Sequence, residues 1–282
     1  GLQLVSGDQR ITADGVIGSP TESLQVRAEN VDVAQLDRLM LGDERLSGRL
    51  TAYASIRGTT AAPLVEGKFS LAPGAFRMFA FDSLAGTVNY AERGVTMDIR
   101  LDQTPTAWFT ATGFAPLTLF RPTPPQMVGV GAPPAPGEAV DIQIASSAID
   151  LGVIQGFTSY VTDVTGVLQA NVKVSGSGYD PRFGGAIDIR GGAFAIPALG
   201  TDYTGLDTRI DLQSDRFTIS EFKILDNRGF PMTIGGNLGL HERAVGDVNI
   251  SITSENFEVI DNELADLKLD TNVQITGELQ QP

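Results

Sequence analysis

Apolar and polar residues alternate in short segments along most of the chain. In residues 50–56, 84–90, 95–101 and 168–174, almost every second residue is apolar, and most of the residues between them are polar. A period of two with one apolar face is typical of half-buried β-strands. Because such segments recur every 8–14 residues, the pattern predicts an all-β fold built from antiparallel meanders.

Two segments interrupt the alternation and carry a weak helical pattern. Residues 30–40 predict a short helix with Asn30 or Asp32 at its N-cap. Residues 150–157 occupy a comparable place, but they contain two glycines, which disfavour a helix.

The chain repeats itself with a long period. Gly48, Pro63 and Phe76 recur 118 residues later as Gly166, Pro181 and Phe194. Further along, the offset becomes 122, so that Val88 corresponds to Ile210 and Met97 to Ile219. A third copy begins near residues 255–257, which resemble residues 29–31. Internal similarity of this kind predicts repeats of about 120 residues.

These offsets divide the chain into five parts. We expect residues 1–20 to be the tail of a preceding repeat, 21–120 the first repeat, 139–242 the second, and 243–282 the start of a truncated third. Residues 121–138 hold six prolines, which cannot donate ladder hydrogen bonds, so this part is predicted to be a loop or linker. Both ends look cut from a longer array.

Composition removes many classes of function. The 282 residues carry a formal net charge of −14, the opposite of what a nucleic-acid binder needs. There is no cysteine, which excludes disulfides, zinc–thiolate sites and thiol catalysis. The single histidine, His241, lies in a predicted turn with no candidate partner. We therefore expect no enzyme activity, no metal and no cofactor.

The sequence shows neither a membrane-spanning helix nor a signal peptide. No apolar run reaches the roughly 18 residues of a membrane-spanning helix. Residues 1–30 lack a basic start followed by an apolar stretch, so no signal peptide is visible.

The apolar face is the informative feature, and it has two interpretations. In one, two sheets bury their apolar faces against each other in a sandwich or barrel. In the other, one sheet folds along its length into an open trough whose apolar lining needs a non-protein occupant, since large exposed apolar surfaces are unfavourable. Lipid acyl chains would be the natural occupant.

The candidate lining residues are the apolar members of the alternating segments in both repeats. They are Ile56, Phe69, Leu71, Phe76, Val88, Tyr90, Val95, Met97, Ile99, Phe109, Leu168, Val172, Val174, Ile187, Ile189, Phe194, Ile210, Leu212, Phe217, Ile219, Met232 and Ile234.

A repeated phrase gives the chain a family resemblance. Leu46-Ser47-Gly48-Arg49-Leu50, followed by Gly58, Pro63 and Gly67, recurs as Thr165-Gly166-Val167-Leu168, followed by Gly176, Pro181 and Gly185, and each phrase leads to Gly-Ala-Phe. This resembles the repeating C-terminal region of the TamB family of AsmA-like envelope proteins. The resemblance implies an elongated, strongly curved antiparallel sheet, the β-taco, with an open hydrophobic groove.

The resemblance also implies a function. Such a chain would be a segment of a bridge in the periplasm of a diderm bacterium, and it would carry phospholipids between the inner and outer membranes by shielding their acyl chains. An inner-membrane anchor and an outer-membrane barrel partner would lie outside this fragment. Two alternatives remain: an assembly factor that guides outer-membrane barrel proteins through exposed sheet edges, and an adhesive or carbohydrate-binding β-repeat protein.

Overall fold

The computed structural model describes residues 1–18, 21–35, 46–60, 62–91, 93–121, 137–156, 158–241 and 244–278. Within these residues, eighteen strands belong to one antiparallel sheet that is not closed into a barrel. The chain forms two compact units, the first of residues 1–144 and 175–179, and the second of residues 145–174 and 180–282. The Pro-rich residues 122–136 lie outside the described ranges.

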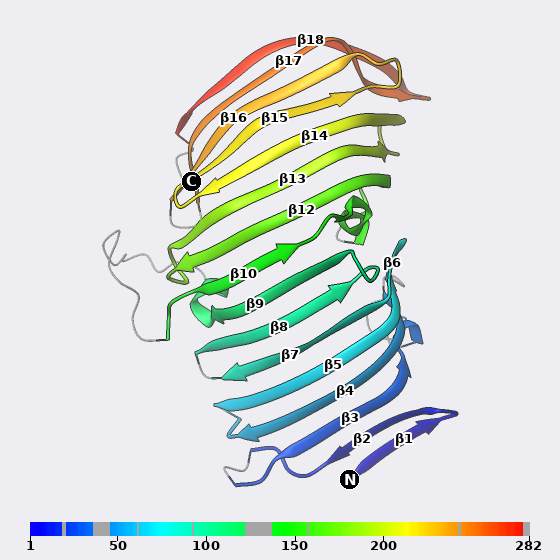
Figure 1. The fold of residues 1–282 in the computed structure, drawn as a ribbon, viewed down its shortest axis with the longest axis vertical. Coiled ribbons are helices and arrows are strands. Elements are labelled where there is room, and N and C mark those ends of the chain that lie inside the picture. The colour runs from blue at the N-terminus through cyan, green and yellow to red at the C-terminus, as the bar shows by residue number, and fades with distance from the viewer. Residues whose placement is uncertain are drawn as a thin grey trace. The chain divides into compact units, whose positions relative to one another are not determined.

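Unit 1 is a meander in which each strand pairs with its neighbours in sequence (Figure 1). The short β6 is an excursion, because β5 pairs with both β6 and β7. The elements are β1 (Leu2–Ser6), β2 (Gln9–Asp14), β3 (Leu24–Asp32), β4 (Leu46–Gly58), β5 (Pro63–Phe76), β6 (Phe79–Phe81), β7 (Ser83–Ala91), β8 (Gly94–Asp102), β9 (Trp108–Pro116), the 3₁₀ helix η1 (Leu117–Phe120) and the first residues of β10 (Asp141–Ser146).

Unit 2 contains the longer strands. Register is continuous from β13 to β18 with local bulges. The elements are β11 (Ile149–Asp150), the 3₁₀ helix η2 (Leu151–Gly156), β12 (Thr162–Gly176), β13 (Pro181–Ile196), β14 (Thr201–Gln213), β15 (Arg216–Leu225), β16 (Pro231–His241), β17 (Ala244–Asn262) and β18 (Ala265–Glu278).

The period-two segments all lie in strands, so the all-β prediction is confirmed. Residues 50–56 fall in β4, 84–90 in β7, 95–101 in β8 and 168–174 in β12. The division into repeats remains a prediction.

The expected helix over residues 30–40 starts later than predicted. Residues 30–32 complete β3, and only residues 33–35 are helical among those described; residues 36–40 lie outside the described ranges. The Asp32 carboxylate accepts the Ala34 N–H at 3.1 Å, as an N-cap does. Asn30 is instead a strand residue with φ +54° at a bulge between β3 and β4. Cross-strand pairing therefore overrides the local helical pattern at this end.

The segment with two glycines forms a 3₁₀ helix, η2. Its start is fixed by Asp150, whose Oδ1 accepts the Gly152 N–H at 2.7 Å. Leu151 is 1% exposed and belongs to a buried cluster of unit 2. We call this cluster the core cluster; it consists of Leu151, Val164, Tyr203, Leu206, Ile224 and Phe257.

Neighbouring strands approach closely at particular glycines. Gly185 of β13 has φ +111°, and a Cβ there would lie 1.9 Å from the Asn171 carbonyl oxygen of β12. The adjacent Gly184 has no atom within 4 Å of its Cβ position. The two neighbours therefore differ in both backbone conformation and available space.

We expect Gly185→Ala to destabilise the protein by more than about 1 kcal/mol, because the new methyl group collides with β12 and the backbone is strained. Gly184→Ala, the matched control, should change stability by less than about 1 kcal/mol. Urea unfolding midpoints measure both variants. Equal midpoints for the two would contradict the close approach.

Candidate functional site

Within each unit, the predicted lining residues occupy alternating positions that the strand register brings together on one face. None of the twenty-two is exposed: Leu71, Val172, Val174 and Leu212 are buried, and the others are half-buried. Residues between them point the other way, and Asn89, Asp98 and Lys173 are exposed. The apolar and polar faces assigned from the sequence are therefore separated by burial as well.

In unit 1, the register aligns apolar residues into rows that cross the strands. One row contains Leu50 of β4, Leu71 of β5, Leu84 of β7, Leu101 of β8 and Phe109 of β9, each opposite the next. Residues directly opposite in antiparallel strands lie on the same face about 5 Å apart. Apolar contact thus continues from strand to strand, without a polar interruption, across this row.

In unit 2, a comparable row spans six strands. We call it the isoleucine row; its members, in strand order from β13 to β18, are Ile187, Ile210, Ile219, Gly236, Ile250 and Ile275. With strands about 4.8 Å apart, the row covers about 24 Å. All members except Ile275, which is 47% exposed, are half-buried.

Part of the apolar face of unit 2 is covered by protein. Leu168, Ile189, Phe194 and Met232, four of the predicted lining residues, pack against the core cluster. Tyr203 stacks on Phe257 with ring centroids 5.4 Å apart and planes 4° from parallel. This end of the face is a filled core, which the sequence did not reveal.

Val172 is also more enclosed than an open trough implies, because it is 7% exposed. A carboxylate introduced there would enter a buried position and would be unfavourable whatever the face binds. The half-buried Met97 and Ile210 are better probes of the apolar face.

The opposite face carries ion pairs. Arg209 of β14 binds Asp188 at 2.9 Å and Asp211 at 2.9 Å, and Arg100 binds Asp102 at 2.8 Å. The hydrogen bonds that Arg209 donates to Asp211 and Asp188 raise the pKa of Arg209. Exposed pairs of this kind add little stability, and they mark the solvated side of the sheet.

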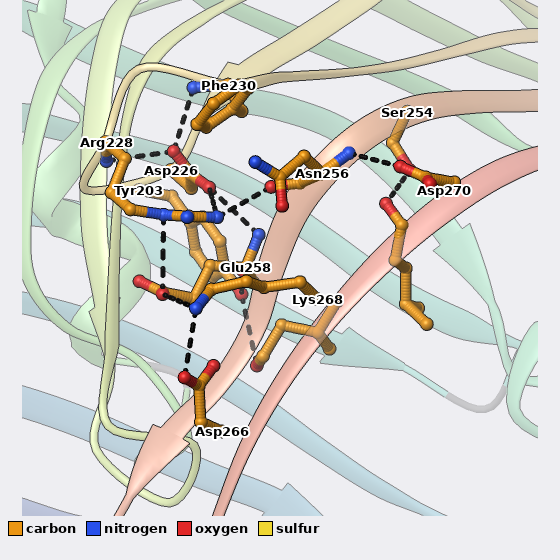
Figure 2. A network of polar contacts seen from close by, with 12 residues as sticks. Tyr203, Asp226, Arg228, Phe230, Ser254, Asn256, Glu258, Asp266, Lys268 and Asp270 are labelled. Carbon is orange, nitrogen blue, oxygen red and sulfur yellow. Dashed lines mark hydrogen bonds and ion pairs between the residues drawn. The ribbon is translucent and has the colours of Figure 1, made fainter.

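A network of hydrogen bonds and ion pairs in unit 2 surrounds Asp226, in the turn between β15 and β16, and Glu258 of β17 (Figure 2). The Asp226 side chain is 1% exposed and accepts the backbone N–H groups of Arg228 at 2.9 Å, Phe230 at 2.8 Å and Glu258 at 2.9 Å. Glu258 lies between Arg228 at 3.5 Å and Lys268 at 3.9 Å. The network ties the β15–β16 turn to β17 and β18.

Burial raises the pKa of Asp226, but the three backbone hydrogen bonds and the charge of Arg228 outweigh it, so the pKa lies below its ordinary value. A carboxylate whose pKa is lower in the folded state stabilises the fold above its unfolded-state pKa of about 3.9. That contribution disappears as the pH falls through the folded-state pKa.

The described residues contain neither a cluster of metal ligands nor a membrane-spanning helix. No cluster of acidic or histidine residues suited to a metal ion occurs within the described ranges. His241 is the last residue of β16, opposite Ala244. A search of the described residues for a helix long and apolar enough to cross a bilayer finds none.

The sequence pattern predicted neither the Asp226 network nor the aromatic part of the core cluster. The Asp226-Asn227-Arg228-Gly229 run signals a turn. Nothing in the sequence links Asp226 to Glu258, which is 32 residues away.

Comparison with protein-family models, with curated proteins and with solved structures finds no match for this chain.

We expect Asp226→Asn to destabilise unit 2 by about 1–3 kcal/mol at neutral pH, because the amide's NH₂ group faces N–H donors. The wild type should lose stability as the pH falls below about 4, and the variant should show a smaller loss over that range. Chemical unfolding at pH 3 to 7 measures this difference.

Asp266→Asn is the control, because Asp266 is 59% exposed and pairs with Lys268 at 2.9 Å. It should change stability by less than about 1 kcal/mol. An identical pH profile in the wild type and Asp226→Asn would rule out the role given to Asp226.

Proposed function

We propose that this chain is a segment of a lipid-transfer bridge between the inner and outer membranes of a diderm bacterium. Phospholipid acyl chains lie against the apolar rows, and head groups remain in water. The isoleucine row carries the proposal, because it offers apolar contact across six consecutive strands. No chemical step is needed, so the chain acts without catalytic residues or cofactors.

The long repeat is part of the proposal, and a pair of bulges supports it. The sequence aligns Glu29-Asn30-Val31 with Glu255-Asn256-Phe257. Asn30 has φ +54° and Asn256 has φ +50°, and the ladder shifts register at each. Val31 and Phe257, which follow them, are 3% and 2% exposed. A strongly curved, open β-taco built from these repeats is the arrangement we propose.

The side chains of the isoleucine row also suit a mobile ligand. Its contacts are aliphatic and lack direction, so they favour an apolar chain without selecting a particular lipid. A hollow of about 200 Å³ bordered by Leu4, Ile11 and Val31 lies among β1, β2 and β3 of unit 1. Polar residues, among them Gln9, Arg10 and Gln35, also border it, so its apolar surface is only part of its lining.

Photo-crosslinking tests the lipid path. A photoreactive residue at Met97 or Ile210 should capture phospholipid, because both side chains lie on the apolar face. The same residue at the adjacent Asp98 or Arg209, on the polar face, should capture little. Mass spectrometry of extracted adducts measures capture, and similar labelling at both kinds of position would contradict the proposal.

The assembly-factor alternative is favoured by one observation. β18 is exposed along nearly its whole length, and Leu267, Leu269, Val273 and Ile275 are 37–47% exposed in one apolar row. Such a strand suits β-augmentation by an unfolded barrel strand.

We expect Val273→Lys to lower capture of an unfolded outer-membrane barrel protein if β18 binds such clients, and to leave lipid capture at Met97 unchanged. Asn272→Lys, on the other face of β18, is the matched control. The denatured barrel protein is diluted rapidly into buffer that contains each variant, and a pull-down then measures how much of it is captured. Equal capture by both variants would remove this alternative.

A further inference from the structure

The pairing of β17 with β18 repeats the pairing of β3 with β4. Residues of β17 stand 226 positions after their counterparts in β3, as Ile250 does after Leu24, and residues of β18 stand 219 positions after their counterparts in β4, as Ile275 does after Ile56. The matching cross-strand pairs are Leu24–Ile56 and Ile250–Ile275, Ala28–Ala52 and Ser254–Thr271, and Val31–Leu50 and Phe257–Leu269. Both ladders shift register between the second and the third of these pairs. In its contacts, β18 is therefore the counterpart of β4.

β4 has a paired strand on both sides, whereas β18 has one on a single side. The second neighbour of β4 is β5, which pairs Val65 with Ile56 and Leu71 with Leu50. We call the edge of β18 that faces away from β17 its outer edge; no ladder continues from it within the described part of the chain. Ile56 is half-buried beside β5, and its counterpart Ile275 is 47% exposed. The apolar row of β18 thus lacks the cover that β5 gives to β4.

A glycine marks the place where the neighbouring strand comes closest. Val273 of β18 corresponds to Ala54 of β4 and, by the 118-residue offset, to Val172 of β12. Gly67 of β5 is paired with Ala54. Gly185 of β13 lies against Val172, because a Cβ at Gly185 would be 3.3 Å from the Val172 Cα. Both neighbouring strands therefore have a glycine at this place.

We propose that the outer edge of β18 binds an antiparallel strand of a further repeat, with the pattern of β5 and β13, in the register that joins β4 to β5. The bound strand brings a glycine opposite Val273 and apolar residues opposite Leu269 and Ile275. This inference rests on the long repeat that is part of the proposed function, and it names the strand pattern that the exposed edge recognises.

The glycine separates this partner from an unrelated strand, such as that of an outer-membrane barrel. Any extended strand can supply main-chain hydrogen bonds to an edge. The register is fixed only where the apolar pattern also matches, and the close approach at Val273 adds a second condition. By the geometry seen at Gly185, a side chain at that place would meet the backbone of the neighbouring strand.

A synthetic peptide of residues 181–196, the sequence of β13, tests the proposal against the complete 282-residue chain. The labelled peptide should bind, and its Gly185→Ala form should bind about fivefold or more weakly, because a methyl group at that place is strained and collides with the neighbour. The Gly184→Ala peptide is the matched control and should bind like the parent, since no atom lies within 4 Å of the Gly184 Cβ position. Fluorescence anisotropy measures the affinities.

Variants of the chain locate the binding edge. Val273→Lys should weaken binding of the parent peptide about fivefold or more, because it places a charge in the apolar row that the peptide covers. Asn272→Lys, on the other face of β18, adds the same charge and should leave binding within about twofold of the wild type. Backbone amides of β18 should exchange hydrogen more slowly when the peptide is bound.

Equal binding of the parent and Gly185→Ala peptides, or no binding of the parent, would overturn the inference. So would a denatured barrel protein that displaces the peptide and binds β18 more tightly, which would assign the edge to the assembly-factor alternative. Lipid capture at Met97 in unit 1 separates the two proposals, because Met97 lies on β8. Capture there without peptide binding would overturn the inference alone, and peptide binding without lipid capture at Met97 or Ile210 would overturn the lipid path alone.

Discussion

The structure depends on the coincidence of two periodicities: side chains alternate along each strand, and antiparallel register carries that alternation across the strands. Where Ile210 faces one side, Ile187 and Ile219 must face it too, because they are direct neighbours in the ladder. A shift of one residue would move a whole strand's apolar set to the polar side. Separation into an apolar face and an ion-paired face follows from this single requirement.

Bulges interrupt the register between neighbouring strands, and polar contacts stabilise the backbone at these bulges. In β17, register shifts on both sides of Phe257 and Glu258 free backbone groups from the β17–β18 ladder. Asp226 accepts the Glu258 N–H, and Asp270 accepts the Asn256 N–H at 2.5 Å. The buried Asp226 carboxylate and the exposed Asp270 carboxylate satisfy main-chain donors that a regular ladder would have satisfied.

Much of the fold was predictable from the sequence because strand alternation is a local signal. The segments at 95–101 and 168–174 show their apolar side without knowledge of their partners. The end of β3 was mispredicted as helix, since residues 30–32 take their conformation from pairing with β4. Tyr203, Phe257 and Asp226 were missed for a related reason: their contacts join residues that are more than 30 positions apart.

The regularity of the isoleucine row has a consequence for motion. Under the proposed function, moving an alkyl chain between neighbouring isoleucines replaces one set of aliphatic contacts with a nearly identical set, so its energy changes little. The exception is β16, where Gly236 has no side chain to contribute. A surface of this kind resists movement of a ligand away from the row, but the barrier to sliding along the row is low. Residence time and mobility are then decoupled: the depth of the apolar contact sets how long a chain stays, and the unevenness between neighbouring strands sets how fast it slides.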